Sequence, residues 1–84
     1  MTGKHRQTLG RIFEAPGRAD IPWRDIEAVF IALGGDMSEG RGSRVRVALR
    51  GVRAVFPRPH PRKEAGKVLV KSVRRFLAET GVAP

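Results

Sequence analysis

The chain has 84 residues, no cysteine and a formal net charge of +9 at pH 7. A chain of this length buries little more than about 60% of its unfolded surface, so it suits one small domain with a shallow surface site and excludes a deeply buried cofactor. Without cysteine it forms neither disulfides nor thiolate metal sites. Its polar first residues and the lack of any long apolar run predict a cytoplasmic protein with no membrane partner.

The positive charge is concentrated in one segment. Residues 1–40 contain 5 Lys/Arg and 6 Asp/Glu, a net charge of −1, and residues 76–84 add only one acidic residue. Residues 41–75 contain 12 Lys/Arg against Glu64 alone, a net charge of +11. A surface that serves solubility alone mixes both signs of charge. This segment therefore predicts contact with a polyanion, foremost a nucleic acid, and an acidic protein is a further candidate partner.

Two helices are predicted in the less charged first part of the chain. Leu9, Ile12 and Phe13 have helical spacing and predict a first helix over residues 5–14, whose histidine is expected at the surface. Residues 15–20 contain Pro and Gly and are expected to form a linker. Pro22 is suited to open a second helix.

The second helix is expected to end at Gly34-Gly35 in a left-handed cap. Its apolar stripe comprises Trp23, Ile26, Val29, Phe30 and Leu33. Trp23 lies in phase with this stripe, so we expect it in the core rather than stacked on a base. Asp25 and Glu27 are expected on the outer face, away from the basic segment.

A β-hairpin is predicted after this helix. Residues 36–39 form a first, weak strand, and the alternating stretches over residues 44–49 and 52–57 pair through a two-residue Arg50-Gly51 turn. This register places six apolar residues on one face: Val45, Val47, Leu49, Val52, Ala54 and Phe56. The opposite face then carries Arg44, Arg46 and Arg53. The glycine-rich turn over residues 40–43, with its N–H groups and the Ser43 hydroxyl, could hold a phosphate.

The segment after the hairpin alternates proline with basic residues. Pro57, Pro59 and Pro61 fix an extended backbone, which excludes an interior strand and presents Arg58, His60 and Arg62 outward. A histidine between two arginines has its charged form disfavoured, so its neutral form is available as a base. His60 is therefore the best candidate for general acid–base catalysis. The other interpretation is a surface histidine whose neighbours bind phosphate.

A final helix is predicted over residues 67–80. Its inward stripe comprises Leu69, Val73, Phe76 and Leu77, and its solvent side comprises Lys67, Lys71, Arg74 and Arg75. Gly81 and Val82 are expected to close it in a Schellman-type motif. The element order predicts an α+β fold of the α-β-β-β-α type found in double-stranded RNA-binding domains, with a three-stranded antiparallel sheet and helices on one face, preceded by a short N-terminal helix.

Several of these features together resemble the HicA family of bacterial toxin–antitoxin toxins. They are the amphipathic helix ending in glycine, the Gly-Ser turn that opens the hairpin, the Pro59-His60 exit, and the basic last helix ending in residues 77–82. The resemblance covers roughly residues 23–82. It implies an N-terminal helical extension and linker over residues 1–21 and a HicA-like RNA-binding domain over residues 22–84.

The resemblance implies an mRNA interferase, a metal-independent ribonuclease without a cofactor that a HicB-like acidic antitoxin neutralises. In the family a catalytic histidine follows the Gly-Ser pair, but here Arg44 stands at that position. Arginine does not act as a base at neutral pH, although it can stabilise a pentacoordinate phosphorane. Either His60 takes over proton transfer, or the protein binds RNA and cleaves it poorly or not at all.

The working hypothesis gives His60 the role of base and gives Arg44 and Ser43 the stabilisation of developing charge. The expected RNA-binding residues are Arg41, Arg46, Arg53, Arg58, Arg62, Lys63, Lys67, Lys71 and Arg74. No metal site is expected, because no cluster of Asp, Glu and His has ligand spacing. The alternatives are a non-catalytic RNA-binding module and an adaptor that docks an acidic partner.

Overall fold

The computed structural model describes residues 1–14, 20–60 and 62–84. The elements in chain order are α1 (Gly3–Phe13), β1 (Ile21–Pro22), α2 (Trp23–Ala32), β2 (Asp36–Glu39), β3 (Arg44–Leu49), β4 (Val52–Pro57), β5 (Glu64–Ala65) and α3 (Lys67–Glu79). The expected linker, apart from Asp20, lies outside the described residues, and so does Pro61 of the proline-rich exit.

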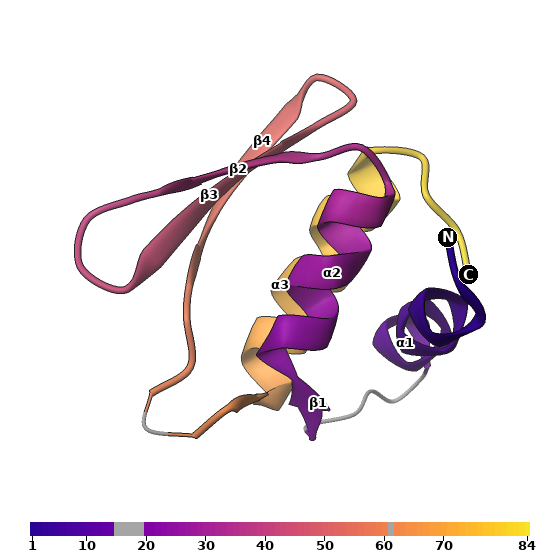
Figure 1. Ribbon diagram of the computed structural model, residues 1–84, viewed down its shortest axis with the longest axis horizontal. Helices are drawn as coiled ribbons and strands as arrows, with labels where there is room; N and C mark the ends of the chain where they lie inside the picture. Colours follow the sequence, from indigo (N-terminus) through magenta and orange to yellow (C-terminus); the bar gives the residue numbers. More distant parts are fainter. Residues whose placement is uncertain (15–19, 61) are drawn as a thin grey trace.

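The expected α+β architecture is confirmed. Strands β2, β3 and β4 form an antiparallel sheet in that order, and α2 and α3, which meet through Phe30 and Phe76, lie on one face of it (Figure 1). Helix α1 packs against both of these helices on the side away from the sheet. The chain between α2 and α3 therefore forms the sheet and its exit, with one face of the sheet left open.

The predicted hairpin register is confirmed in every pair. Leu49 lies opposite Val52, and the pairing continues without a bulge to Arg44 opposite Pro57. Arg50 has φ 50° and Gly51 has φ 82°, the two successive positive values that a type I′ turn requires. This turn matches the twist of the strands, so it fixes the register on which both faces of the sheet depend.

Four aromatic rings form the centre of the core. Trp23 and Phe30 come from α2, Phe56 from β4 and Phe76 from α3, and their contacting ring centroids lie 5.6–6.4 Å apart. The expectation that Trp23 belongs to the core is confirmed, since its side chain is buried. The rings come from both helices and from the sheet, so the cluster ties α2 and α3 to the sheet.

The apolar stripe of α3 is wider than predicted. Val73, Phe76 and Leu77 are buried as expected, but Val70 is also fully buried and Leu69 is only half-buried. The reason is that α3 contacts α1 as well as β4, so two sides of the helix need apolar residues. Its expected Schellman closure is confirmed, because the Val82 N–H donates to the Leu77 carbonyl at 3.0 Å.

The beginnings of α1 and α2 differ from the predicted ones. Helix α1 starts two residues earlier than expected, after a capping box in which Thr2 accepts from the His5 N–H and His5 Nδ1 accepts from the Thr2 N–H. Histidine is an unusual partner in this motif, which normally uses Glu or Gln. Pro22 precedes α2 instead of opening it, and lies in β1, a two-residue strand paired with β5.

The β1–β5 pair was not predicted, because two residues are too few to show a strand pattern. In it Ile21 lies opposite Ala65, and both residues are fully buried. The Trp23 N–H donates to the Lys63 carbonyl at 2.8 Å directly beside it. These contacts hold the start of α2 against the segment that leads into α3.

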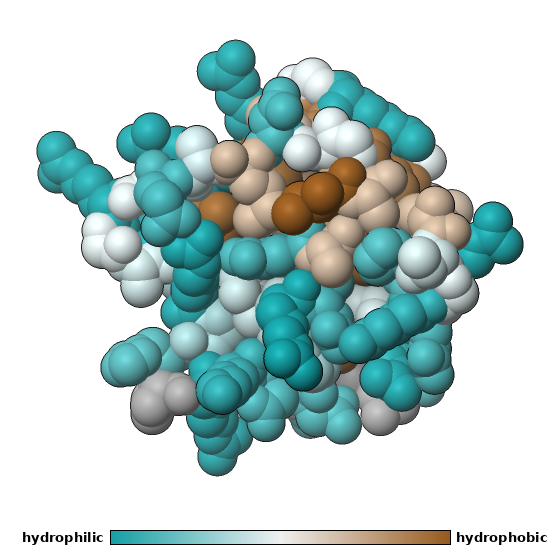
Figure 2. Space-filling model, in the orientation of Figure 1, coloured by the Kyte–Doolittle hydropathy of each residue, from teal (hydrophilic) through white to brown (hydrophobic). Residues whose placement is uncertain are grey.

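The surface is mostly hydrophilic, with a hydrophobic band over the C-terminal part of α2 (Figure 2). Ile31, in the last turn of α2, is 63% exposed. No helix within the described ranges is both long enough and apolar enough to span a membrane.

Phe30 and Ile31 offer a matched test of the aromatic core. Phe30 is fully buried and contacts three other rings, so Phe30→Ala should lower the free energy of unfolding by about 3–5 kcal/mol. The exposed neighbour should tolerate Ile31→Ala within about 0.5 kcal/mol. Urea denaturation measures both values, and equal losses in the two variants would refute this description of the core.

Candidate nucleic-acid interface

The open face of the sheet presents arginine side chains. Along β3 the buried residues Val45, Val47 and Leu49 alternate with exposed Arg44 and Arg46. On β4 Arg53 is exposed on the same open face. The alternation of the strands thus separates an apolar inner face from a cationic outer face, as the sequence predicted.

The three arginines are spread across the open face rather than stacked opposite one another. Arg44 lies opposite Pro57, Arg46 opposite Val55, and Arg53 opposite Ala48. Like charges directly opposite each other would destabilise the sheet, so this spacing avoids repulsion. A hollow of about 520 Å³ crosses the three strands beside Arg46 and Arg53. Among the described residues none of the three arginines forms an ion pair with a carboxylate, so all three can bind an external anion.

The turn over residues 40–43 lies at one end of this face. Its backbone is held by the Gly40 N–H, which donates to the Arg44 carbonyl at 2.9 Å, and by the Arg44 N–H, which donates to the Arg41 carbonyl at 3.1 Å. These two N–H groups therefore bond within the protein. Arg41 and Ser43 are exposed at the tip of the turn, where a phosphate could reach their side chains.

The segment that follows β4, called the exit, carries Arg58, Pro59 and His60 and begins beside the same turn. The Arg58 N–H donates to the Ser43 carbonyl at 3.1 Å, which extends the pairing by one residue beyond Pro57. His60 is two residues farther along, so its Cα lies within about 7 Å of the Arg58 Cα. His60, Ser43 and Arg44 are all exposed at this end of the sheet. The segment that carries His60 therefore begins beside the turn that carries Ser43 and Arg44.

Arg58 was expected to point outward into solvent, but its side chain is bound to two carboxylates of the protein. Its two terminal nitrogens donate to the Glu39 carboxylate at 2.9 and 2.7 Å, and its Nε donates to Glu27 at 3.1 Å. The same Glu27 oxygen accepts from the Trp23 indole N–H at 2.6 Å. The expectation that Glu27 lies away from the basic segment is therefore wrong. Arg58 connects α2, β2 and the β4 exit in one network.

Hydrogen bonds and charge within this network shift two ionisation equilibria. The Arg58 guanidinium lowers the pKa of the Glu39 carboxyl below its usual value. Hydrogen bonds to Glu39, and then to Glu27, raise the pKa of Arg58. Both groups consequently keep their charges at neutral pH, and the guanidinium fork of Arg58 is occupied by carboxylates.

Arg74 also makes contacts within the protein. Its Nε donates to the Ile12 carbonyl at 2.8 Å and its Nη2 donates to the Glu14 carbonyl at 3.3 Å. These bonds satisfy carbonyls at the C-terminal end of α1, where a cation is favourable. Arg74 therefore attaches α1 to α3, and its predicted contact with RNA stays a prediction.

The remaining predicted RNA-binding residues lie outside the sheet face. Arg62 and Lys63 are exposed between β4 and β5, and Lys67 and Lys71 are exposed on α3. Lys67 and Lys71 line cavities between α3 and the outer edge of β4. The basic surface thus continues from the open face around the edge of the sheet. Within the described ranges, no group of three or more His, Asp or Glu residues could hold a metal ion.

The Arg58–Glu39 pair predicts a loss of stability in acid. Because the folded-state pKa of Glu39 is lowered, its contribution is complete above the unfolded value of about 4.3 and is lost as pH falls through the lower folded value. Thermal unfolding of the wild type and Glu39→Gln should therefore differ at pH 7 and converge below about pH 4. Glu64→Gln, at an exposed carboxylate, is the control. A constant difference between wild type and Glu39→Gln across this pH range would contradict the assignment.

The sequence was compared with protein families, with curated proteins and with solved structures. No curated protein and no solved structure is significantly similar to it. The model of the HicA toxin family of bacterial toxin–antitoxin systems, however, matches residues 23–82. The matched range begins with α2, contains the whole sheet, the turn over residues 40–43 and the exit with His60, and ends after α3. The chain therefore belongs to the HicA family of bacterial toxins.

Proposed function

We propose that this toxin is a cytoplasmic mRNA interferase that binds RNA on the open sheet face and cleaves it without a metal ion. The observation that carries the proposal is that the arginines of the open face, the exposed turn at Ser43 and the start of the segment that carries His60 adjoin one another at one end of the sheet. The proposal includes a HicB-like acidic antitoxin as the neutralising partner. The family membership supports a toxin with an antitoxin, and the cationic surface supports RNA as the target.

The proposed reaction is attack by a ribose 2′-hydroxyl on the neighbouring phosphate. His60 accepts the proton of the 2′-hydroxyl, which makes the oxygen a better nucleophile. Arg44 and the Ser43 hydroxyl donate hydrogen bonds to the phosphate oxygens as negative charge develops in the pentacoordinate state. The bond to the 5′-oxygen of the next nucleotide breaks and that oxygen takes up a proton. The products are a 2′,3′-cyclic phosphate and a free 5′-hydroxyl.

The remaining cations have binding roles in this proposal. Arg41 and Arg46 flank Arg44 on the turn and on β3, so they can contact the phosphates on either side of the scissile one. A guanidinium fork can bridge two phosphate oxygens. Arg62 and Lys63 extend the cationic surface beyond His60. Arg58 holds the exit in place through Glu39 and Glu27, which makes it a positioning residue for His60.

Two observations favour a second candidate function. Arg44 occupies the position after the Gly-Ser pair, and within the described part of the chain no hydrogen bond or ion pair orients the exposed His60. A protein with this surface could bind RNA without cleaving it. The alternative is therefore a non-catalytic RNA-binding module, in which the same arginines make the phosphate contacts.

The two functions are separated by incubating a transcript with the purified protein in EDTA. The wild type is expected to cleave it and to leave 2′,3′-cyclic phosphate ends. His60→Ala should slow cleavage by about 100-fold or more, the usual contribution of a general base, while RNA affinity changes little. Arg44→Ala should slow cleavage by about 100-fold through lost charge stabilisation.

His5 provides the matched control, because it is the other histidine of the chain and lies in α1. His5→Ala removes half of a capping box and should lower stability by about 1 kcal/mol without changing the rate of cleavage. Full cleavage by His60→Ala in EDTA would exclude His60 as the base. RNA binding by the wild type without any cleavage would establish the non-catalytic module.

A further inference from the structure

Strand β4 is an edge strand whose outer backbone groups are unpaired by the sheet. The type I′ turn makes Leu49–Val52 a hydrogen-bonded pair, and hydrogen-bonded pairs then recur at every second residue of an antiparallel ladder. Arg53 and Val55 are therefore in non-hydrogen-bonded pairs with β3. Their N–H and C=O groups point away from β3, toward the outside of the sheet. The edge ends at Pro57, which has no N–H. A chain lying beside β4 could form up to four backbone hydrogen bonds here.

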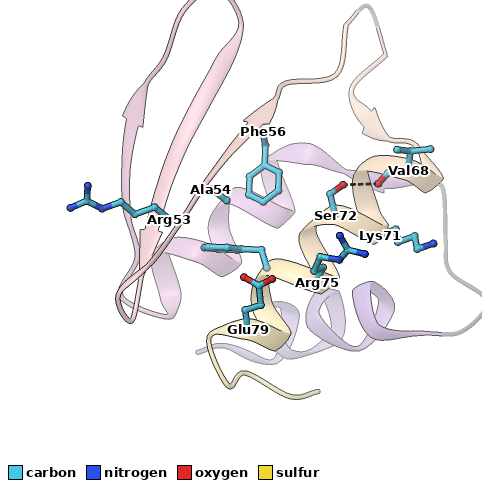
Figure 3. Close-up of a pocket in the computed structure, with 9 residues that line it drawn as sticks. Arg53, Ala54, Phe56, Val68, Lys71, Ser72, Arg75 and Glu79 are labelled. Atoms are coloured by element: carbon cyan, nitrogen blue, oxygen red, sulfur yellow. Dashed lines mark hydrogen bonds between the residues drawn. The ribbon is translucent and has the colours of Figure 1, made fainter.

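A groove runs between this edge and α3. Two adjoining cavities, of about 370 and 460 Å³, share Phe56, Val68 and Ser72 in their walls. In Figure 3 the Phe56 side chain points toward α3, and the Arg53 side chain extends away from it. The groove therefore has a strand edge along one wall and a helix along the other.

Apolar side chains are exposed on both sides of the β4 edge. Val68 is 81% exposed and Val55 is 54% exposed. These are two of the four large apolar residues that are exposed within the described ranges; Val68 lies on the α3 wall of the groove, and Val55 lies on the strand edge with its side chain on the open face of the sheet. Scattered apolar residues on a surface need no explanation, but a pair beside an unpaired strand edge is the arrangement that binds an extended peptide.

The charge around the groove selects the kind of peptide. Lys67, Lys71 and Arg75 project from α3 along the cavities, against Glu79 as the acidic residue lining them. We propose that an extended, acidic and apolar segment of a partner protein adds to the sheet as a fourth strand beside β4. Its backbone pairs with Arg53 and Val55, its apolar side chains cover Val55 on the open face of the sheet, and its carboxylates, on the opposite side of the added strand, meet the cations of α3 in the groove.

A second copy of this chain fits the groove less well. Pairing β4 with β4 would bring Arg53 of both copies to one short edge, and each chain has a net charge of +9. Repulsion between such chains, together with the missing N–H of Pro57, opposes edge-to-edge association. The natural donor of the segment would be the antitoxin, an identification that rests on the proposed function.

The test uses a blocked peptide of sequence Glu-Val-Asp-Val-Glu-Val-Asp and the isotope-labelled full chain without RNA. We expect binding with a dissociation constant below about 1 mM, together with slower amide hydrogen exchange at Arg53 and Val55. A peptide with lysine in place of every acidic residue should bind at least about tenfold more weakly. Because no RNA is present, this result does not depend on whether the protein cleaves transcripts.

Two variants locate the binding site. Val68→Glu adds a negative charge in the groove and should weaken binding at least about tenfold, whereas Ile31→Glu, the same change at an exposed residue of α2, should alter it less than about threefold. Val55→Pro removes one edge N–H at a position where an edge strand tolerates proline, and should weaken binding at least about tenfold. Val55→Thr, which keeps this N–H, is the control and should bind the peptide as the wild type does.

Several results would overturn the proposal. They are the absence of peptide binding, equal binding of the lysine peptide, equal effects of Val68→Glu and Ile31→Glu, or protection of β2 amides in place of those of β4. Protection of the Arg53 and Val55 amides by single-stranded oligouridine but not by the peptide would make the groove an RNA surface, and would overturn the proposal as well.

Discussion

The register of the β3–β4 hairpin is the constraint on which the rest of the structure depends. The Arg50-Gly51 turn places Val45, Val47 and Phe56 in the core and Arg44 and Arg46 on the opposite face. A slip by one residue would exchange these faces and bury two charges. Because Phe56 joins the aromatic cluster with Trp23, Phe30 and Phe76, the same register that exposes the arginines also attaches the sheet to the helices.

The ion-pair network of Arg58 fixes the segment that follows the hairpin. It connects the β4 exit to Glu39 on β2 and to Glu27 on α2, and Glu27 in turn accepts from Trp23 at the edge of the aromatic cluster. An exposed ion pair contributes little by itself, but a network that starts from a buried indole has a fixed geometry. The position of the segment that carries His60 therefore depends on a basic residue whose own charge is already paired.

Much of the fold could be predicted from sequence because its signals are local. The alternation of β3 and β4, the Arg50-Gly51 turn and the glycine at the end of α2 each dictate a conformation within a few residues. The parts that were missed depend on contacts between distant residues. The residues next to Arg58 and Arg74 in the sequence do not reveal their partners. Glu39 reaches Arg58, and the end of α1 reaches Arg74, only in the folded chain. Likewise, Val70 is buried because α1 covers a second side of α3, and no periodicity within α3 reveals that neighbour.

We propose that the open sheet face, and not positive charge in general, binds RNA. It is tested most directly by the affinity for a single-stranded RNA over a range of salt concentrations, for the wild type, Arg46→Ala on the open face and Arg6→Ala on α1. Each lost phosphate contact should reduce the slope of log affinity against log salt by about 0.7. We expect this reduction for Arg46→Ala and an unchanged slope for Arg6→Ala. Equal slopes in all three proteins, or an equal reduction in both variants, would contradict it.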